Sequence, residues 1–160
     1  MKLERQVDVM ASPEEVWKFF WNIPELASCI PGCTSARAEG EPGHYAATVK
    51  VRVGQFRVEF QLEIDVVDVV DGQKITARVQ GTDRHTGARM VSDLQLRVLA
   101  AETGGAVVWL ENDFQVYGRL ASMGHSIVMR RGEDIMDEFA QNVRTRLSHS
   151  APKDDASQLA

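Results

Sequence analysis

The sequence contains no apolar run that approaches the roughly 18 residues needed to cross a lipid bilayer. Its N-terminal stretch, MKLERQVDVMASPEEVW, carries charges where a secretory signal peptide would carry its apolar region. It also has no internal repeat and no linker that would divide two domains. These absences predict a soluble, cytoplasmic protein with a single domain, the usual expectation for a chain of 160 residues.

Clustered positive charge and metal-ligand motifs are also missing. The net charge is -5 at pH 7, whereas a protein that binds the phosphate backbone needs a clustered basic surface. The four histidines show none of the spacings that are typical of metal ligands. We therefore expect no nucleic-acid partner, no metal site and no cofactor.

Cysteine is scarce: the chain has two, Cys29 and Cys33, in the segment CIPGC. Proline followed by glycine is typical of a tight turn, so the two thiols are expected to flank a reversal of the chain. A metal site would need two further ligands, and without a secretory signal both thiols are expected to stay reduced. The ends of a turn are near enough for a strained disulfide, so oxidation stays open.

What the sequence does contain is a periodic pattern of apolar residues. The first segment, KLERQVDV, alternates as a half-buried strand does. A helix is predicted next, because Ser12 can cap it, Pro13 suits its first turn and Glu15 completes a capping box. Pro24 ends that helix, and PELASCI is predicted to form a second short helix that closes at the proline-glycine turn.

From Thr34 onward the period changes to two, which predicts about six further strands. The clearest alternation is FRVEFQLEIDVV, which places apolar and polar side chains on opposite faces. Such strands belong to an antiparallel sheet that is wetted on one side. The inward face then holds Phe56, Val58, Phe60, Leu62, Ile64 and Val66 and, farther along, Met90, Leu94, Leu96, Val98, Val108, Leu110, Phe114 and Val116.

The last predicted element is a helix from about Arg119 to Leu147, because apolar residues recur there at helical spacing. Gly124 and Gly132 interrupt it, so a bend or a close contact is expected at either. The segment that follows is small, polar and proline-bearing, and it is expected to be disordered. The domain is therefore predicted to cover residues 1–148, and the disordered tail residues 149–160.

Together these elements predict an α+β fold with a cavity. A sheet with one apolar face must cover that face, and only the C-terminal helix is long enough to do so. Because a sheet twists, a straight helix laid across its concave face cannot touch it everywhere. We expect the gap to form an apolar cavity of ~300 to 1,000 Å³, with a core filled by side chains as the alternative.

Three stretches resemble one known family: ASPEEVWKFF at 11–20, CIPGC at 29–33 and VYGRLASMGHSIV at 116–128. They are similar to the CoxG family of carbon monoxide dehydrogenase, within the START and polyketide cyclase-like (SRPBCC) superfamily. The resemblance covers about residues 1–148 and implies the helix-grip fold. In that fold a curved antiparallel sheet of about seven strands wraps around a long C-terminal helix, and two short helices follow the first strand.

The resemblance implies an accessory protein more than an enzyme. The family is associated with molybdenum hydroxylases of the carbon monoxide dehydrogenase type, which it is thought to recruit to the membrane or to link with the quinone pool. Longer members carry a C-terminal anchor, whereas this chain ends in KDDASQLA, so at most peripheral contact with the inner face of the membrane is expected. A soluble carrier of a lipophilic molecule, such as a quinone, fits the sequence better.

The residues expected to contact a ligand lie on the inward face of the sheet and at the start of the last helix: Phe60, Leu62, Met90, Leu94, Asn112, Phe114, Val116, Met123 and Ile127. One alternative is a polyketide cyclase-like enzyme that uses Ser92, Asn112 or His125 to polarise a carbonyl. Another is an assembly factor without a ligand. We assign no catalytic residue, because no nucleophile lies beside a base and no paired carboxylates occur within the alternation.

Overall fold

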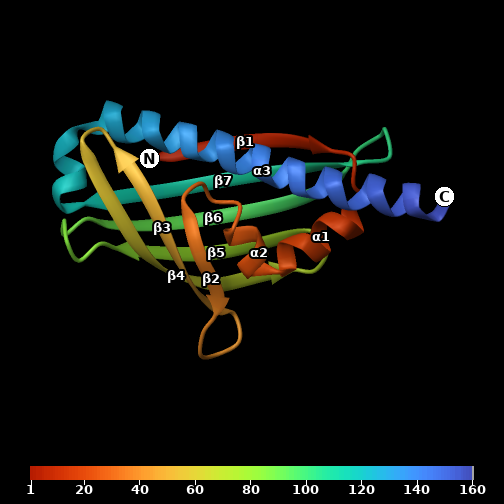
Figure 1. The fold of residues 1–160 in the computed structure, drawn as a ribbon, viewed down its shortest axis with the longest axis horizontal. Coiled ribbons are helices and arrows are strands. Elements are labelled where there is room, and N and C mark those ends of the chain that lie inside the picture. Colours follow the sequence, from red (N-terminus) through yellow and green to blue (C-terminus); the bar gives the residue numbers. More distant parts are fainter. Residues whose placement is uncertain (160) are drawn as a thin grey trace.

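The computed structural model describes the backbone of residues 1–159 and the side chains of residues 1–148. It contains one antiparallel sheet of seven strands in the order β1-β7-β6-β5-β4-β3-β2, and Figure 1 shows this sheet curving around one long helix. The strands are β1 (Lys2–Val9), β2 (Cys33–Ala38), β3 (His44–Val53), β4 (Phe56–Val70), β5 (Lys74–Thr82), β6 (Arg89–Ala100) and β7 (Ala106–Tyr117). The predicted α+β helix-grip architecture is confirmed.

The alternation of apolar and polar residues gives the sheet its apolar inner face. In β4 the buried residues Val58, Phe60, Leu62 and Ile64 alternate with exposed polar and charged residues, as predicted. β4 pairs with β3 on one side and with β5 on the other. Gly72, with a φ of +73°, lies in the predicted turn between β4 and β5.

The two edges of the sheet are β1 and β2. β1 pairs with β7, and the register places Leu3 opposite Asn112. β2 pairs with β3 and has a register shift between Cys33 and Ser35, which marks a bulge. Because β1 lies beside β7, the first and last strands of the chain both contribute to the face under the long helix (Figure 1).

Two short helices, α1 (Pro13–Trp21) and α2 (Ile23–Ala27), lie at one end of the sheet near the C-terminal part of the long helix (Figure 1). The Glu15 amide donates a hydrogen bond of 3.3 Å to Ser12 Oγ, which is the predicted cap. Val16 and Phe20 are fully buried, so the apolar stripe of α1 packs into the core. Both helices follow β1, as predicted.

The CIPGC segment forms the predicted turn. Gly32 has a φ of +86°, and the Lys50 amide donates a hydrogen bond of 2.9 Å to the Gly32 carbonyl, which fixes the turn against β3. Cys29 is buried, Cys33 is partly buried, and both are free thiols. Burial raises the pKa of the Cys29 and Cys33 thiols, which favours their protonated, unreactive form.

The buried carboxylate of Asp83 ties the turn between β5 and β6 to β4. It accepts hydrogen bonds from the amides of Glu59 at 3.1 Å and His85 at 2.9 Å, and from the hydroxyl of Thr86 at 3.0 Å. Burial opposes ionisation, but these hydrogen bonds outweigh it and lower the pKa of Asp83. Nothing in the sequence pattern indicated this role.

The last helix begins later than predicted. A 3₁₀ helix, η1 (Gly118–Met123), comes first and α3 (His125–Leu159) follows it. Gly124 separates the two with a φ of +98°, which residues with a side chain rarely adopt, so the prediction of one helix from Arg119 is wrong. At Gly132 the predicted close contact is present: a Cβ there would lie 2.9 Å from Phe114 Cζ and 3.2 Å from Leu3 Cδ1.

The predicted tail, residues 149–160, falls on residues whose side chains lie outside the described part of the structure. Its disorder and the domain boundary at residue 148 therefore stay predictions. Among the described residues, no helix combines the length and the apolar character that a membrane span requires.

We expect Gly32→Ala to lower the free energy of unfolding by about 2 to 4 kcal/mol. The added Cβ would overlap the Lys50 carbonyl oxygen, and the φ of +86° disfavours any side chain. Gly72→Ala is the matched control, because Gly72 has a φ of +73° but nothing within 4 Å of the added Cβ. It should cost only about 1 to 2 kcal/mol. Urea unfolding measures both losses, and equal losses would contradict the role of the contact with β3.

Candidate ligand-binding cavity

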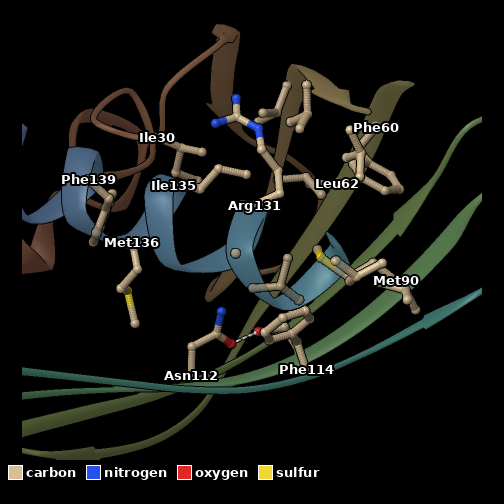
Figure 2. A pocket seen from close by; sticks show the side chains of 18 of the residues that line it. Ile30, Phe60, Leu62, Met90, Asn112, Phe114, Arg131, Ile135, Met136 and Phe139 are labelled. Carbon is tan, nitrogen blue, oxygen red and sulfur yellow. Dashed lines mark hydrogen bonds between the residues drawn. The ribbon is translucent and has the colours of Figure 1, made fainter. Parts of the chain in front are cut away.

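A cavity of about 180 Å³ lies between α3 and the inner face of the sheet (Figure 2). Its walls come from β3 to β7, from α3, from Leu120 of η1 and from Ile30 in the CIPGC turn. Most lining side chains are aliphatic or aromatic, and the full set is Ile30, Val49, Val51, Val53, Phe60, Leu62, Val79, Met90, Ser92, Leu94, Asn112, Phe114, Val116, Leu120, Val128, Arg131, Gly132, Ile135, Met136 and Phe139.

The cavity is smaller than the ~300 to 1,000 Å³ expected from the sequence. Large side chains, Phe60, Phe114 and Phe139 among them, occupy part of the gap between helix and sheet. The core is still not filled: the remaining space is about 180 Å³. An apolar cavity of about 150 Å³ holds a benzene molecule. The cavity as it stands therefore accommodates a ring-sized group, and a longer molecule would have to extend beyond it.

Seven of the nine predicted ligand-contacting residues line this cavity: Phe60, Leu62, Met90, Leu94, Asn112, Phe114 and Val116. They come from β4, β6 and β7, and the alternation of each strand turns them inward. Figure 2 shows several of them facing the helix across the open space. Their role in binding a ligand stays a prediction.

Met123 and Ile127 do not line the cavity. Ile127 is 48% exposed, because α3 begins at His125 and its first turn presents that side chain to solvent. Met123 ends η1 and packs over Gly54 in the turn between β3 and β4, where it covers one end of the sheet. His125, considered for an enzymatic role, is exposed and also lies outside the cavity wall.

The sequence analysis missed the side of the cavity that α3 supplies. Val128, Arg131, Gly132, Ile135, Met136 and Phe139 recur at helical spacing and face the sheet. That spacing is the signal that could have identified them. A charged residue and a glycine within the stripe concealed it, because the analysis followed apolar residues alone. Ile30 was also missed, since it belongs to a turn.

Two polar side chains stand in the wall that the sheet forms. Ser92 on β6 is 4% exposed, and its hydroxyl donates a hydrogen bond to Asn112 Oδ1 on β7. In Figure 2 the amide nitrogen of Asn112 is turned toward α3 and into the cavity. This buried pair places one amide donor in an otherwise apolar wall.

Arg131 is the one ionisable side chain among the residues that line the cavity in the described part of the structure. Its Nε donates a hydrogen bond of 2.8 Å to the Arg52 carbonyl at the end of β3, and this bond ties α3 to the sheet. Figure 2 shows its guanidinium group directed away from Asn112. The positive charge therefore lies at the side of the cavity that is opposite the polar pair.

The described side chains of the cavity wall include no carboxylate, imidazole or thiol. Within residues 1–148, no group of three His, Cys, Asp or Glu side chains is arranged to hold a metal ion. The site thus offers apolar surface, a hydrogen-bonding pair and one cation at its margin.

Residues 6–148 match the family model for CoxG, which is described as a component of carbon monoxide dehydrogenase. A comparison with curated protein sequences found no match.

Solved structures share the fold at low sequence identity. A conserved protein from Geobacillus kaustophilus has a TM-score of 0.83 and 17% identity, over 94% of this chain and 97% of that one. A START superfamily protein from Mycobacterium smegmatis has a TM-score of 0.71 and 12% identity, over 92% and 97% of the two chains. The Zhui aromatase/cyclase from Streptomyces sp. R1128 has a TM-score of 0.60 and 16% identity, over 94% and 98%.

We expect Ser92→Ala to lower the free energy of unfolding by about 1 to 2 kcal/mol, because it leaves Asn112 Oδ1 without a donor. Asn112→Leu should cost a similar amount, since it leaves the buried Ser92 hydroxyl unpaired. The double variant removes both polar groups and should be no less stable than either single variant. Thermal and urea unfolding of all three measure this coupling, and additive losses would contradict it.

Proposed function

Because the chain belongs to the CoxG family, we propose that it binds a lipophilic molecule as an accessory to a molybdenum hydroxylase of the carbon monoxide dehydrogenase type. The observation that supports this proposal is the apolar cavity between α3 and the sheet. Burial of apolar ligand surface drives binding with about 25 cal/mol per Å². A quinone is the ligand class that best connects such a cavity with the electrons released by a hydroxylase, and its delivery would aid electron transfer or membrane recruitment.

The composition of the cavity favours binding over catalysis. General acid–base chemistry needs a titratable group within hydrogen-bond reach of the reacting atoms. Arg131 is the one such group in the described wall, and its guanidinium points away from Ser92 and Asn112 (Figure 2). The similarity to the Zhui aromatase/cyclase, at 16% identity, extends to the fold alone. A cyclase-like activity therefore has no acid or base to carry it in this cavity.

Organic extraction of the natively purified protein, followed by mass spectrometry, tests the proposal. We expect a lipophilic compound with a ring-sized head group, present in an amount comparable to that of the protein. The same extraction of a protein of unrelated fold, purified in parallel, supplies the background. A clean extract, combined with no uptake of added quinone, would show that the protein is an assembly factor without a ligand.

We expect Leu94→Trp to abolish retention of that compound, because the larger side chain occupies much of the 180 Å³ cavity. Leu99→Trp is the matched control, since Leu99 lies on the same strand but is 51% exposed on the opposite face. Its extract should equal that of the wild type. Circular dichroism checks that both variants keep the fold. Full retention by Leu94→Trp would mean that the ligand lies elsewhere.

A further inference from the structure

We propose that Asn112 recognises a neutral oxygen acceptor, such as a ketone carbonyl, on the buried end of the lipophilic ligand. This inference rests on the proposed function, since it assumes that the cavity holds a guest, and it adds the chemistry by which the guest is selected. Shape and apolar surface alone would admit any hydrocarbon of suitable size. A placed hydrogen-bond donor discriminates against such molecules.

Asn112 lies in a row of inward-facing residues that is otherwise apolar. The sheet register places Leu3 of β1 on one side of it and Leu94 of β6 on the other. A leucine at this position would continue the wall without a polar group. An amide placed among apolar side chains is unfavourable unless its donors and its acceptor find partners.

The hydrogen bond from Ser92 sets the direction in which the amide faces. The Ser92 hydroxyl donates to Oδ1, so the oxygen of the amide is turned toward β6. The nitrogen is then directed toward α3 and into the cavity, as Figure 2 shows. Among the described residues, Ser92 is the one hydrogen-bond partner of the Asn112 side chain. The two N–H donors of Nδ2 are thus available to a bound molecule.

The surroundings of Nδ2 define the chemical class that it can accept. A carbonyl, quinone or ether oxygen accepts a hydrogen bond without bringing charge into an apolar space. A carboxylate would need a cation near its buried end, and Arg131 does not supply one. The Arg131 guanidinium is bound to the Arg52 carbonyl through Nε and points away from Asn112. The cavity therefore favours neutral acceptors over anions.

The cavity volume restricts the ligand further. About 180 Å³ suffices for a ring-sized group. The acceptor must then be attached directly to that group, because there is no room for a polar substituent on a long arm. We infer that the selected unit is a cyclic ketone or a quinone-like ring whose oxygen faces β7.

A matched pair of probes tests this inference: 1-tetralone, a bicyclic ketone, and tetralin, the same bicycle without the oxygen. We expect the wild type to bind 1-tetralone about five- to tenfold more tightly than tetralin, the ratio that one net hydrogen bond gives. Equilibrium dialysis with gas chromatography measures both affinities. Equal affinities in the wild type would overturn the inference, and no binding of either probe would overturn the proposed function as well.

Variants then locate the donor. Asn112→Leu should bring the two affinities to within about twofold, and Ser92→Ala/Asn112→Leu also removes the Ser92 hydroxyl as a substitute donor. Leu94→Met is the matched control, because it changes the wall beside Asn112 at nearly constant volume and without a polar group. It should keep the wild-type ratio. An unchanged ratio in both Asn112 variants would overturn the assignment.

A spectroscopic measurement makes the test independent of the stability of the variants. With 1-tetralone labelled with ¹³C at its carbonyl, a hydrogen bond from Nδ2 shifts the bound carbonyl resonance downfield from its position in a hydrocarbon solvent. We expect that shift with the wild type and with Leu94→Met. A bound carbonyl at the hydrocarbon position would overturn the inference even if the affinities differ.

Discussion

A straight helix cannot follow a twisted sheet along its whole length, and this mismatch determines where the protein is solid and where it is hollow. α3 meets the sheet at Gly132, where the absence of a side chain lets the helix approach Phe114 and Leu3. The cavity occupies the space that remains between α3 and strands β3 to β7. The hydrogen bond from Arg131 to the Arg52 carbonyl holds the helix at the far side of that space.

The distribution of polar groups follows from the same geometry. Ion pairs such as Lys2 with Glu111 at 2.8 Å and Arg78 with Asp93 at 3.3 Å lie on the outer face of the sheet, where solvent weakens them. The inner wall keeps the pair formed by Ser92 and Asn112. Whatever selectivity the cavity has must come from its shape and from this pair.

Local patterns predicted features that depend on neighbouring residues, such as the alternation in β4 and the capping of α1 by Ser12. The predicted start of the last helix was wrong because GRLASM has helical spacing, whereas the positive φ of Gly124 separates it from α3. Contacts between distant segments could not be predicted: Asp83 accepts a hydrogen bond from an amide 24 residues away. The pairing of Ser92 with Asn112 likewise required the register of β6 and β7. The cavity volume depends on how aromatic side chains pack in three dimensions, so the sequence predicted too large a space.

The margins of the sheet bear on how the protein behaves at high concentration. β2 is six residues long and bulged near Cys33, and β1 carries Lys2, Glu4 and Arg5. Short, irregular or charged margins are poor templates for the addition of a strand from another molecule. Growth into fibrils through either rim is therefore disfavoured, which suits a protein whose greasy surface is kept on the inside.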